Sequence, residues 1–384
     1  MFASLYLKLS NGYEDGTVYG YYNIPKMFGL QDTGRMESSG ILPVRENSDL
    51  KLDGSSVLIG FVDTGIDYAG SIFLKQDGTT RVTAIWDQTI PAGSPIRLPA
   101  QPELPETPEN ITRTPEGFLY GSEFTHEQLN AAVKMEDAYE GISSRDENGH
   151  GTFLASIAAG NELPDGSFTG AAPKADIAMV KLKPAKNRLR AYYQIKEDAV
   201  AYQENDIMAG VLYLVSLAKK RQQPLVICLG LGTNAGSHRG GLPLARMLEG
   251  LGSSVGITIV AGTGNEGNTA SHTAGFLREN QTEEIEFSIG AYETSLNIQM
   301  WKAYEDQFAI ELLSPGGGSL GVLSSNPGAQ RLKNGGTEIL VYYGEPSPYS
   351  TSQELYLEFT HAGEYLDEGL WKLRLVSEKL VTGV

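Results

Sequence analysis

The sequence has 384 residues, of which 41% are hydrophobic, and a formal net charge of −17. This length accommodates two domains, or one large domain with an insertion. The acidic balance excludes the basic face that nucleic-acid binding requires. The single cysteine, Cys228, excludes an intrachain disulfide and is interpreted as a small buried hydrophobic residue rather than a catalytic thiol. No apolar run reaches the ~18 residues of a membrane-spanning helix.

The first 278 residues divide into an irregular N-terminal stretch and a region where strand and helix patterns alternate. Residues 1–45 have little periodicity and are interpreted as a propeptide remnant or an N-terminal extension. Short apolar, β-branched runs predict strands at 57–62, 81–86, 176–182, 225–231 and 257–261. Helical patterns occur at 125–135, 151–160, 189–220 (one helix or two) and 242–252. This alternation predicts a three-layer α/β sandwich with a mainly parallel sheet over residues 46–278.

From about residue 279 the pattern changes to short stretches with period-two alternation, separated by Gly, Pro and Ser turns. The expected strands are 284–289, 296–301, 308–313, 338–343, 354–359 and 370–375. Residues 279–384 are therefore expected to form an antiparallel β-sandwich or jelly roll. We expect this unit to be an inserted domain that is incomplete in the sequence.

Two motifs carry a carboxylate and an imidazole at positions suited to catalysis. Asp63 ends the first apolar strand, and His150 lies between Gly149 and Gly151 at the start of an Ala-rich helix. A hydroxyl nucleophile needs a base to take its proton, and the base needs a carboxylate to orient it. Alone, each residue is more often structural, but the joint pattern favours His150 as the base and Asp63 as its partner.

The Asp63-Thr-Gly and Asn-Gly-His150-Gly-Thr blocks resemble those of subtilisin-like serine proteases (peptidase S8), and the resemblance covers roughly residues 50–275. A third block, around Asn265, is similar to the segment that supplies the oxyanion donor in that family, which makes Asn265 a candidate catalytic residue. A further similarity implies that Gly230, Leu231 and Gly232 pair with the substrate backbone. Ala261, Gly262, Thr263 and Gly264 would line the other side. Gly230 stands where the family usually has Ser, and this departure is expected to open the S1 pocket.

The insertion before His150 and the β unit after Asn265 together resemble the clostridial spore-germination proteases, in which a jelly roll separates the oxyanion Asn from the nucleophilic Ser. The Gly-Thr-Ser-x-Ala block of that nucleophile is absent from this sequence. Ser295 and Ser352 each follow a Thr, but neither has the preceding Gly or the following Ala-rich helix. We therefore expect the chain to be a C-terminally truncated fragment that is inactive by itself.

Other motifs allow weaker interpretations. Ser254 fits G-x-S-x-G, but a helix precedes it and a strand follows, the reverse of a nucleophile elbow. Gly262–Gly267 fits G-x-G-x-x-G, which with Glu283 or Glu284 keeps a dinucleotide-binding enzyme open as an alternative. Calcium is a weak option at Asp67, Asp146 and Glu147, so no metal and no cofactor is assigned. His238 and His272 are interpreted as structural or rim residues.

The sequence thus predicts a serine endopeptidase of the subtilisin class that hydrolyses peptide bonds by acyl transfer. The alternative is a pseudoprotease that only binds peptides or proteins. Expected partners are a peptide or protein substrate and, by resemblance, a cleaved propeptide, with no nucleic acid and no membrane. The compartment is not given by the sequence; the resemblance alone implies a spore-associated or extracytoplasmic protein.

Overall fold

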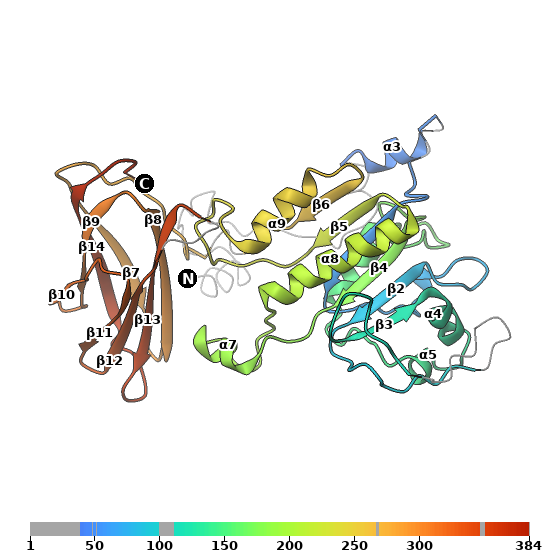
Figure 1. The fold of residues 1–384 in the computed structure, drawn as a ribbon, viewed down its shortest axis with the longest axis horizontal. Helices are drawn as coiled ribbons and strands as arrows, with labels where there is room; N and C mark the ends of the chain where they lie inside the picture. Colours follow the sequence, from blue (N-terminus) through green and yellow to red (C-terminus); the bar gives the residue numbers. More distant parts are fainter. Residues whose placement is uncertain are drawn as a thin grey trace, which may run out of the picture.

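The computed structural model describes residues 39–47, 49–50, 52–99, 111–265, 269–345 and 350–383. These residues form an α/β unit and an all-β unit that follows it along the chain (Figure 1). Of the stretch 1–45, only residues 39–45 are described, and they include the start of the short helix α3 (Ile41–Glu46). In the part of the chain that is described, no helix is long and apolar enough to cross a membrane.

The α/β unit is built on a six-stranded sheet whose neighbours are parallel, except that β3 pairs antiparallel with β2 at one edge. From that edge the order is β3 (Ser122–Thr125), β2 (Val82–Asp87), β4 (Asp176–Lys181), β1 (Leu58–Asp63), β5 (Leu225–Leu229) and β6 (Ile257–Ala261). Every residue of β1 and β2 is buried, as expected for parallel strands covered on both faces. The carboxyl end of β1 therefore lies in the middle of one edge of the sheet.

Helices cover both faces of this sheet, which confirms the predicted three-layer architecture. Alternate residues of β1 supply the two cores: Phe61 packs in the core that includes α6 (His150–Ala159), and Val62 packs in the core that includes α8 (Glu204–Arg221). The first core also takes in α4 (His126–Val133), α5 (Ala138–Gly141) and the 3-10 turn Ser71–Phe73, and the second takes in residues of α9 (Pro243–Gly252).

The all-β unit is a sandwich of two four-stranded antiparallel sheets. One has the order β10-β9-β14-β7 and the other β11-β12-β13-β8. The strands are β7 (Thr282–Ile289), β8 (Ser295–Ala303), β9 (Gln307–Leu313), β10 (Ser319–Val322), β11 (Gly328–Asn334), β12 (Thr337–Tyr343), β13 (Ser352–His361) and β14 (Gly369–Lys379). The first strands pair with the last, β7 with β14 and β8 with β13, which is a jelly-roll-like arrangement. Trp371 and Phe359 are fully buried between the sheets.

The chain enters and leaves the sandwich at the same place. The Leu277 amide, just before β7, donates a hydrogen bond of 2.9 Å to the carbonyl of Gly383, after β14. The Asp306 carboxylate secures this exit by accepting from the backbone amides of Val381, Thr382 and Gly383 at 2.6, 2.8 and 2.9 Å. A unit whose two ends lie together can interrupt another fold without displacing it.

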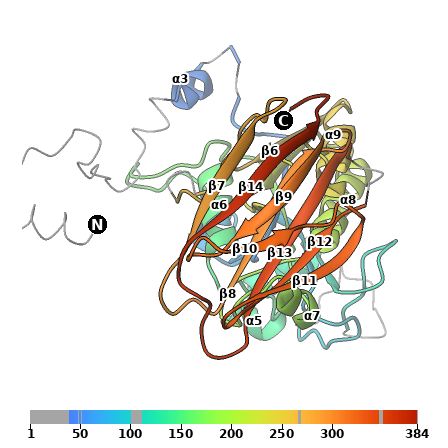
Figure 2. The same ribbon diagram turned by 90° about the vertical axis from the view of Figure 1, so that its left-hand side faces the viewer.

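The sandwich lies to one side of the α/β unit (Figure 1), and Figure 2 looks onto the sandwich from that side. One of its sheets contacts segments that follow β4 and β5. The ring of Tyr192, at the end of α7 (Asn187–Tyr192), stacks on Tyr356 of β13 with centroids 5.7 Å apart. Gln194 donates to the Glu358 carboxylate at 3.1 Å, and the Gly236 amide donates to the side chain of Gln299 on β8 at 3.2 Å. The sandwich thus contacts the loops at the carboxyl ends of the parallel strands.

Candidate functional site

Asp63 lies at the carboxyl end of the central strand β1, and its side chain is only 1% exposed. Its Oδ1 accepts a hydrogen bond of 2.8 Å from Nδ1 of His150 and one of 2.7 Å from the Thr64 amide. The structure therefore brings together the two residues that the sequence selected as base and orienting carboxylate, although they lie 87 positions apart. The contact fixes the ring orientation of His150, which is what a carboxylate partner does for a general base.

His150 is the first residue of α6, and its side chain is 43% exposed. Gly149, the N-cap, has a φ of 88°, in the left-handed region that favours glycine. A Cβ on Gly151 would lie 2.2 Å from the Gly65 carbonyl oxygen, so glycine is required there for the helix to approach the end of β1. The two flanking glycines thus allow the helix to place an exposed imidazole over a buried carboxylate.

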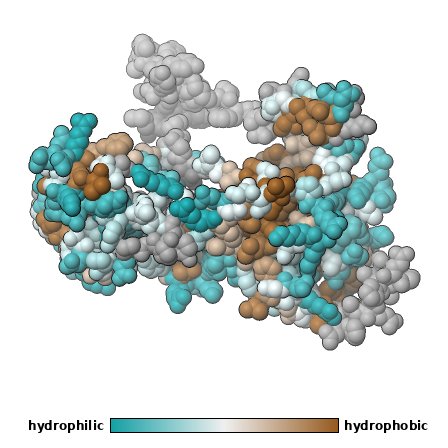
Figure 3. All heavy atoms as spheres, turned by 45° about the horizontal axis from the view of Figure 1, so that its top comes forward, coloured by the Kyte–Doolittle hydropathy of each residue, from teal (hydrophilic) through white to brown (hydrophobic). Residues whose placement is uncertain are grey.

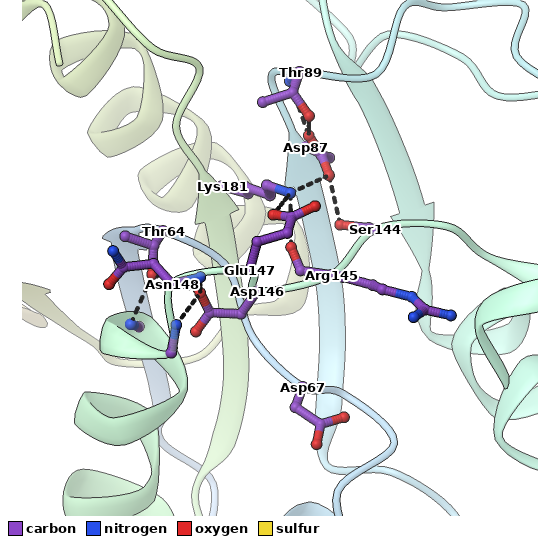
Figure 4. Close-up of polar contacts among 12 residues, drawn as sticks. Thr64, Asp67, Asp87, Thr89, Ser144, Arg145, Asp146, Glu147, Asn148 and Lys181 are labelled. Atoms are coloured by element: carbon purple, nitrogen blue, oxygen red, sulfur yellow. Dashed lines mark hydrogen bonds and ion pairs between the residues drawn. The ribbon is translucent and has the colours of Figure 1, made fainter. Parts of the chain in front are cut away.

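Gly149 has no side chain that could cap α6, and Asp146, in the loop before it, takes this role (Figure 4). Oδ1 of Asp146 accepts from the Gly149 amide at 2.8 Å and from the Thr64 hydroxyl at 2.8 Å, and its Oδ2 accepts from the Thr152 amide at 2.9 Å. The Thr64 hydroxyl accepts from the Gly151 amide at 2.9 Å. These bonds satisfy amides of the first helical turn, and the negative charge is favourable at a helix N-terminus. Asp146 therefore links the helix that carries His150 to the residue beside Asp63.

A buried lysine holds the same loop from the other side. Lys181, the last residue of β4, pairs in register with Asp63, and its side chain is 9% exposed. Its ammonium donates to the Arg145 carbonyl at 2.7 Å and to the Glu147 carboxylate at 2.6 Å, and lies 3.9 Å from Asp87 (Figure 4). Asp87 is fully buried at the end of β2 and accepts a hydrogen bond of 2.6 Å from the Ser144 hydroxyl. Three strand ends thus fix the loop before His150.

Replacing Asp146 by Ala is expected to lower the free energy of unfolding by about 1–2 kcal/mol, the usual cost of losing a helix cap. Burial pushes the pKa of Asp146 upward, but hydrogen bonds from Thr152, Gly149 and Thr64 outweigh it and hold the pKa below its ordinary value. A lowered folded-state pKa gives stability that is present above the unfolded value and is lost as the pH falls through the folded value. The difference between wild type and variant in urea denaturation should therefore be full at neutral pH and shrink below about pH 4.

Asp165→Ala is the matched control for this change, because Asp165 makes a similar local turn with Ser167 but contacts no residue of the site. It should leave the unfolding midpoint close to that of the wild type. Equal losses from both changes would show that Asp146 contributes no more than an ordinary surface turn.

The predicted substrate segments lie at the same edge of the sheet as Asp63. Residues 230–232 follow β5, residues 262–264 follow β6, and the Gly262 amide donates to the Leu229 carbonyl at 3.1 Å. Gly232 and residues 261–264 are exposed. A Cβ on Gly230 would lie 3.0 Å from Cε1 of His150 and 3.2 Å from Oδ2 of Asp63. A side chain at this position would thus face the Asp63–His150 pair.

Asn265 is exposed four residues after the end of β6, and residues 266–268 lie outside the described part of the chain. The segments described on either side of this gap, 262–265 and 269–281, contain no helix of the kind that opens a dinucleotide site. Ser254 lies in the turn between α9 and β6, as its flanking pattern predicted.

The remaining candidates are held by other protein groups. Asp67 binds the Tyr139 hydroxyl, whereas Asp146 and Glu147 belong to the loop described above. In the described ranges no cluster of three or more His, Cys, Asp or Glu side chains fits a metal ion.

The rings of His238 and His272 stack with centroids 4.8 Å apart. Burial, and then the charge of Asp63, raise the pKa of the Cys228 thiol above its ordinary value, which disfavours a nucleophilic thiolate.

Sequence reasoning missed Lys181 and Asp87 as parts of the site. Both lie at the ends of mostly buried strands, and a charged residue at the carboxyl end of a buried parallel strand is a signal that could have found them.

The chain resembles known proteins in sequence and in fold. The profile of the subtilase family matches residues 54–353. The subtilisin-like protease SBT3.8 of Arabidopsis thaliana is 30% identical over 176 residues, which is 41% of this chain and 20% of that protein. The structure of the CspB protease of Clostridium perfringens superposes with a TM-score of 0.71 at 26% identity, over 90% of this chain and 63% of that one. The chain therefore spans less than two thirds of either protein.

Proposed function

The chain belongs to the subtilase family, and from that membership we propose that it supplies two members of the catalytic triad and the oxyanion donor of a serine endopeptidase. The observation that supports this most is the 2.8 Å hydrogen bond between a buried Asp63 and an exposed His150. A histidine whose Nδ1 is held by a buried carboxylate and whose ring is partly exposed is arranged to activate a hydroxyl nucleophile.

The proposed reaction is acyl transfer. Nε2 of His150 takes the proton of a serine hydroxyl as the oxygen attacks the peptide carbonyl carbon. Asp63 stabilises the imidazolium, and the side-chain amide of Asn265 donates a hydrogen bond to the developing oxyanion. His150 then gives the proton to the leaving amine as the peptide bond breaks. In the second half of the reaction, His150 takes a proton from a water molecule that attacks the acyl-enzyme, and returns it to the serine oxygen as the ester bond breaks. Residues 230–232 and 261–264 would bind the peptide backbone beside the cut bond.

We propose that the nucleophile follows residue 384 in a longer polypeptide. Ser295 and Ser352 begin strands β8 and β13 of the sandwich, whereas the family's Ser opens a helix. The sandwich returns the chain at Gly383 to the side of Leu277, from which a continuing chain could rejoin the α/β unit. In this proposal residues 46–278 form the catalytic core, and the sandwich from 279 onward is inserted between Asn265 and the Ser.

The far edge of the α/β unit supports this organisation. β6 ends the sheet among the described residues, and Val260 on it is 51% exposed. No residue of α9 is buried, although residues 247, 248 and 251 are apolar. Hydrophobic residues gather on this face of the unit (Figure 3). An apolar strand edge of this kind is normally covered, and the segment that carries the Ser is the occupant that the proposal requires.

The complete protein, isolated from the cells that produce it, should react with a fluorophosphonate probe, which labels activated serines. Peptide mapping should place the probe on a Ser beyond residue 384, and His150→Ala should abolish labelling. Ser295→Ala and Ser352→Ala are the controls and should leave labelling intact. A complete protein that binds peptides but takes up no probe would instead support the binding-only pseudoprotease.

A further inference from the structure

One oxygen of the Asp63 carboxylate has no hydrogen-bond donor among the described residues. Both contacts of the group, from the Thr64 amide and from His150, are made to Oδ1, whereas Oδ2 is buried without a partner. A buried charged oxygen with no donor costs free energy, and native structures rarely leave one without a reason. The surroundings of Oδ2 show what excludes a donor.

Residue 230 is a position from which a donor could reach Oδ2. The Cβ of a residue there would lie 3.2 Å from Oδ2 of Asp63, and a hydroxyl on that Cβ could reach hydrogen-bond distance. Gly230 does not have the positive φ that requires glycine, so its backbone accepts a side chain. The constraint is space, because the same Cβ would lie 2.3 Å from Cδ1 of Leu154 on α6.

The charged and titratable groups around Asp63 do not replace this donor. Lys181 on β4 directs its ammonium to the Arg145 carbonyl and to Glu147. Burial, and then the negative charge of Asp63, raise the pKa of the Tyr202 hydroxyl above its ordinary value. The same two causes, in the same order, raise the pKa of the Cys228 thiol on β5. Asp146 adds a further negative charge nearby.

We infer that Leu154 and Gly230 form a matched pair of positioning residues, in which Leu154 fills the place of a side chain at position 230 and keeps hydroxyl donors away from Oδ2 of Asp63. His150 is then the only described side chain that donates to this carboxylate, so its negative charge is shared with no second side chain. The hydrogen bond from Nδ1 of His150 is thus made to a carboxylate that accepts from no other described side chain. The inference rests on the proposed function, since both residues act through the Asp63–His150 pair.

The test compares two double variants of this chain, Leu154→Val/Gly230→Ser and Leu154→Val/Gly230→Ala. Valine removes Cδ1 and makes room, and the two variants then differ only by the hydroxyl. The NMR signal of the His150 Nδ1 proton, which lies in the hydrogen bond to Asp63, should move upfield in the Ser variant, because a second donor to the carboxylate weakens that bond. The Ala variant should give the same chemical shift as Leu154→Val alone. Identical chemical shifts for the Ser and Ala variants would overturn the inference.

A second measurement tests the packing between the two residues. Gly230→Ala should lower the Tm of the chain when Leu154 is present and leave it unchanged when Leu154→Val has made room. Equal losses in the two backgrounds would show that Leu154 does not fill the position. Neither measurement needs a nucleophile. A failure here would therefore leave the probe labelling of the complete protein intact, and a failure of labelling would not move the His150 Nδ1 proton signal.

Discussion

Under the proposed mechanism, the Asp63→Asn variant of the complete protein is expected to hydrolyse peptides about 10⁴-fold more slowly than the wild type, with little change in KM. Asp63 is 1% exposed and holds Nδ1 of His150 at 2.8 Å. An amide in its place presents either an NH₂ group to the ring, which favours the wrong tautomer, or a neutral oxygen, which stabilises the imidazolium poorly. The measurement is kcat and KM on a chromogenic peptide.

Asp67→Asn is the matched control, since it makes the same chemical change four residues later on a carboxylate that contacts Tyr139 rather than His150. It should retain kcat within a few-fold of wild type. If Asp63→Asn kept a tenth or more of the wild-type kcat, Asp63 would not be the orienting carboxylate, and the proposed mechanism would fail at its first step.

Strands and helices with strong local signals were predictable from the sequence. The all-buried strands β1 and β2 are mainly apolar, and the helix expected from residue 125 is present as α4, which begins with a capping box between Thr125 and Gln128. Where the sequence allowed one helix or two over 189–220, the structure has two, α7 and α8, separated by residues 193–203.

Elements whose stability comes from their neighbours were missed. β3 has four residues, three of them polar, and its last residue, Thr125, is the N-cap of α4, so the local signal favours a cap. β10 and β11 are edge strands of the sandwich, rich in Gly, Ser and Lys, and β11 alternates intermediate and exposed residues rather than buried ones. Pairing with one neighbour, and not apolar alternation, makes these segments strands.

The site divides in the same way. Asp63 and His150 stand within motifs that local sequence can carry, because a strand end and a glycine-flanked helix start are local structures. The hydrogen bonds that fix the loop before His150 join β1, β2 and β4, and only the folded sheet brings those ends together. Asp146 and Glu147 looked like scattered carboxylates in the sequence, but in the fold they cap a helix and bind a lysine.

Replacing Lys181 by Met should be among the most destabilising single changes in the α/β unit, lowering the free energy of unfolding by about 3–5 kcal/mol. The ammonium is nearly buried and lies 3.9 Å from Asp87, which is fully buried. Removing one partner of such a pair leaves the other charge uncompensated, whereas the methionine has a similar volume and opens no large cavity. Urea denaturation followed by circular dichroism measures the loss.

The double variant Asp87→Asn/Lys181→Met separates the loss of stability caused by the uncompensated charge of Asp87 from the loss caused by changed packing at residue 181. It removes the uncompensated carboxylate and should recover part of the stability that Lys181→Met loses, so the two changes are not additive. Lys174→Met is the control, since the Lys174–Asp53 ion pair is 2.7 Å long but the lysine side chain is 67% exposed; it should cost less than about 1 kcal/mol. If Lys181→Met cost no more than this control, the buried lysine would not be what holds the loop before His150. The position of that loop would then depend on its other contacts, those of Asp146 with Thr64 and of Ser144 with Asp87.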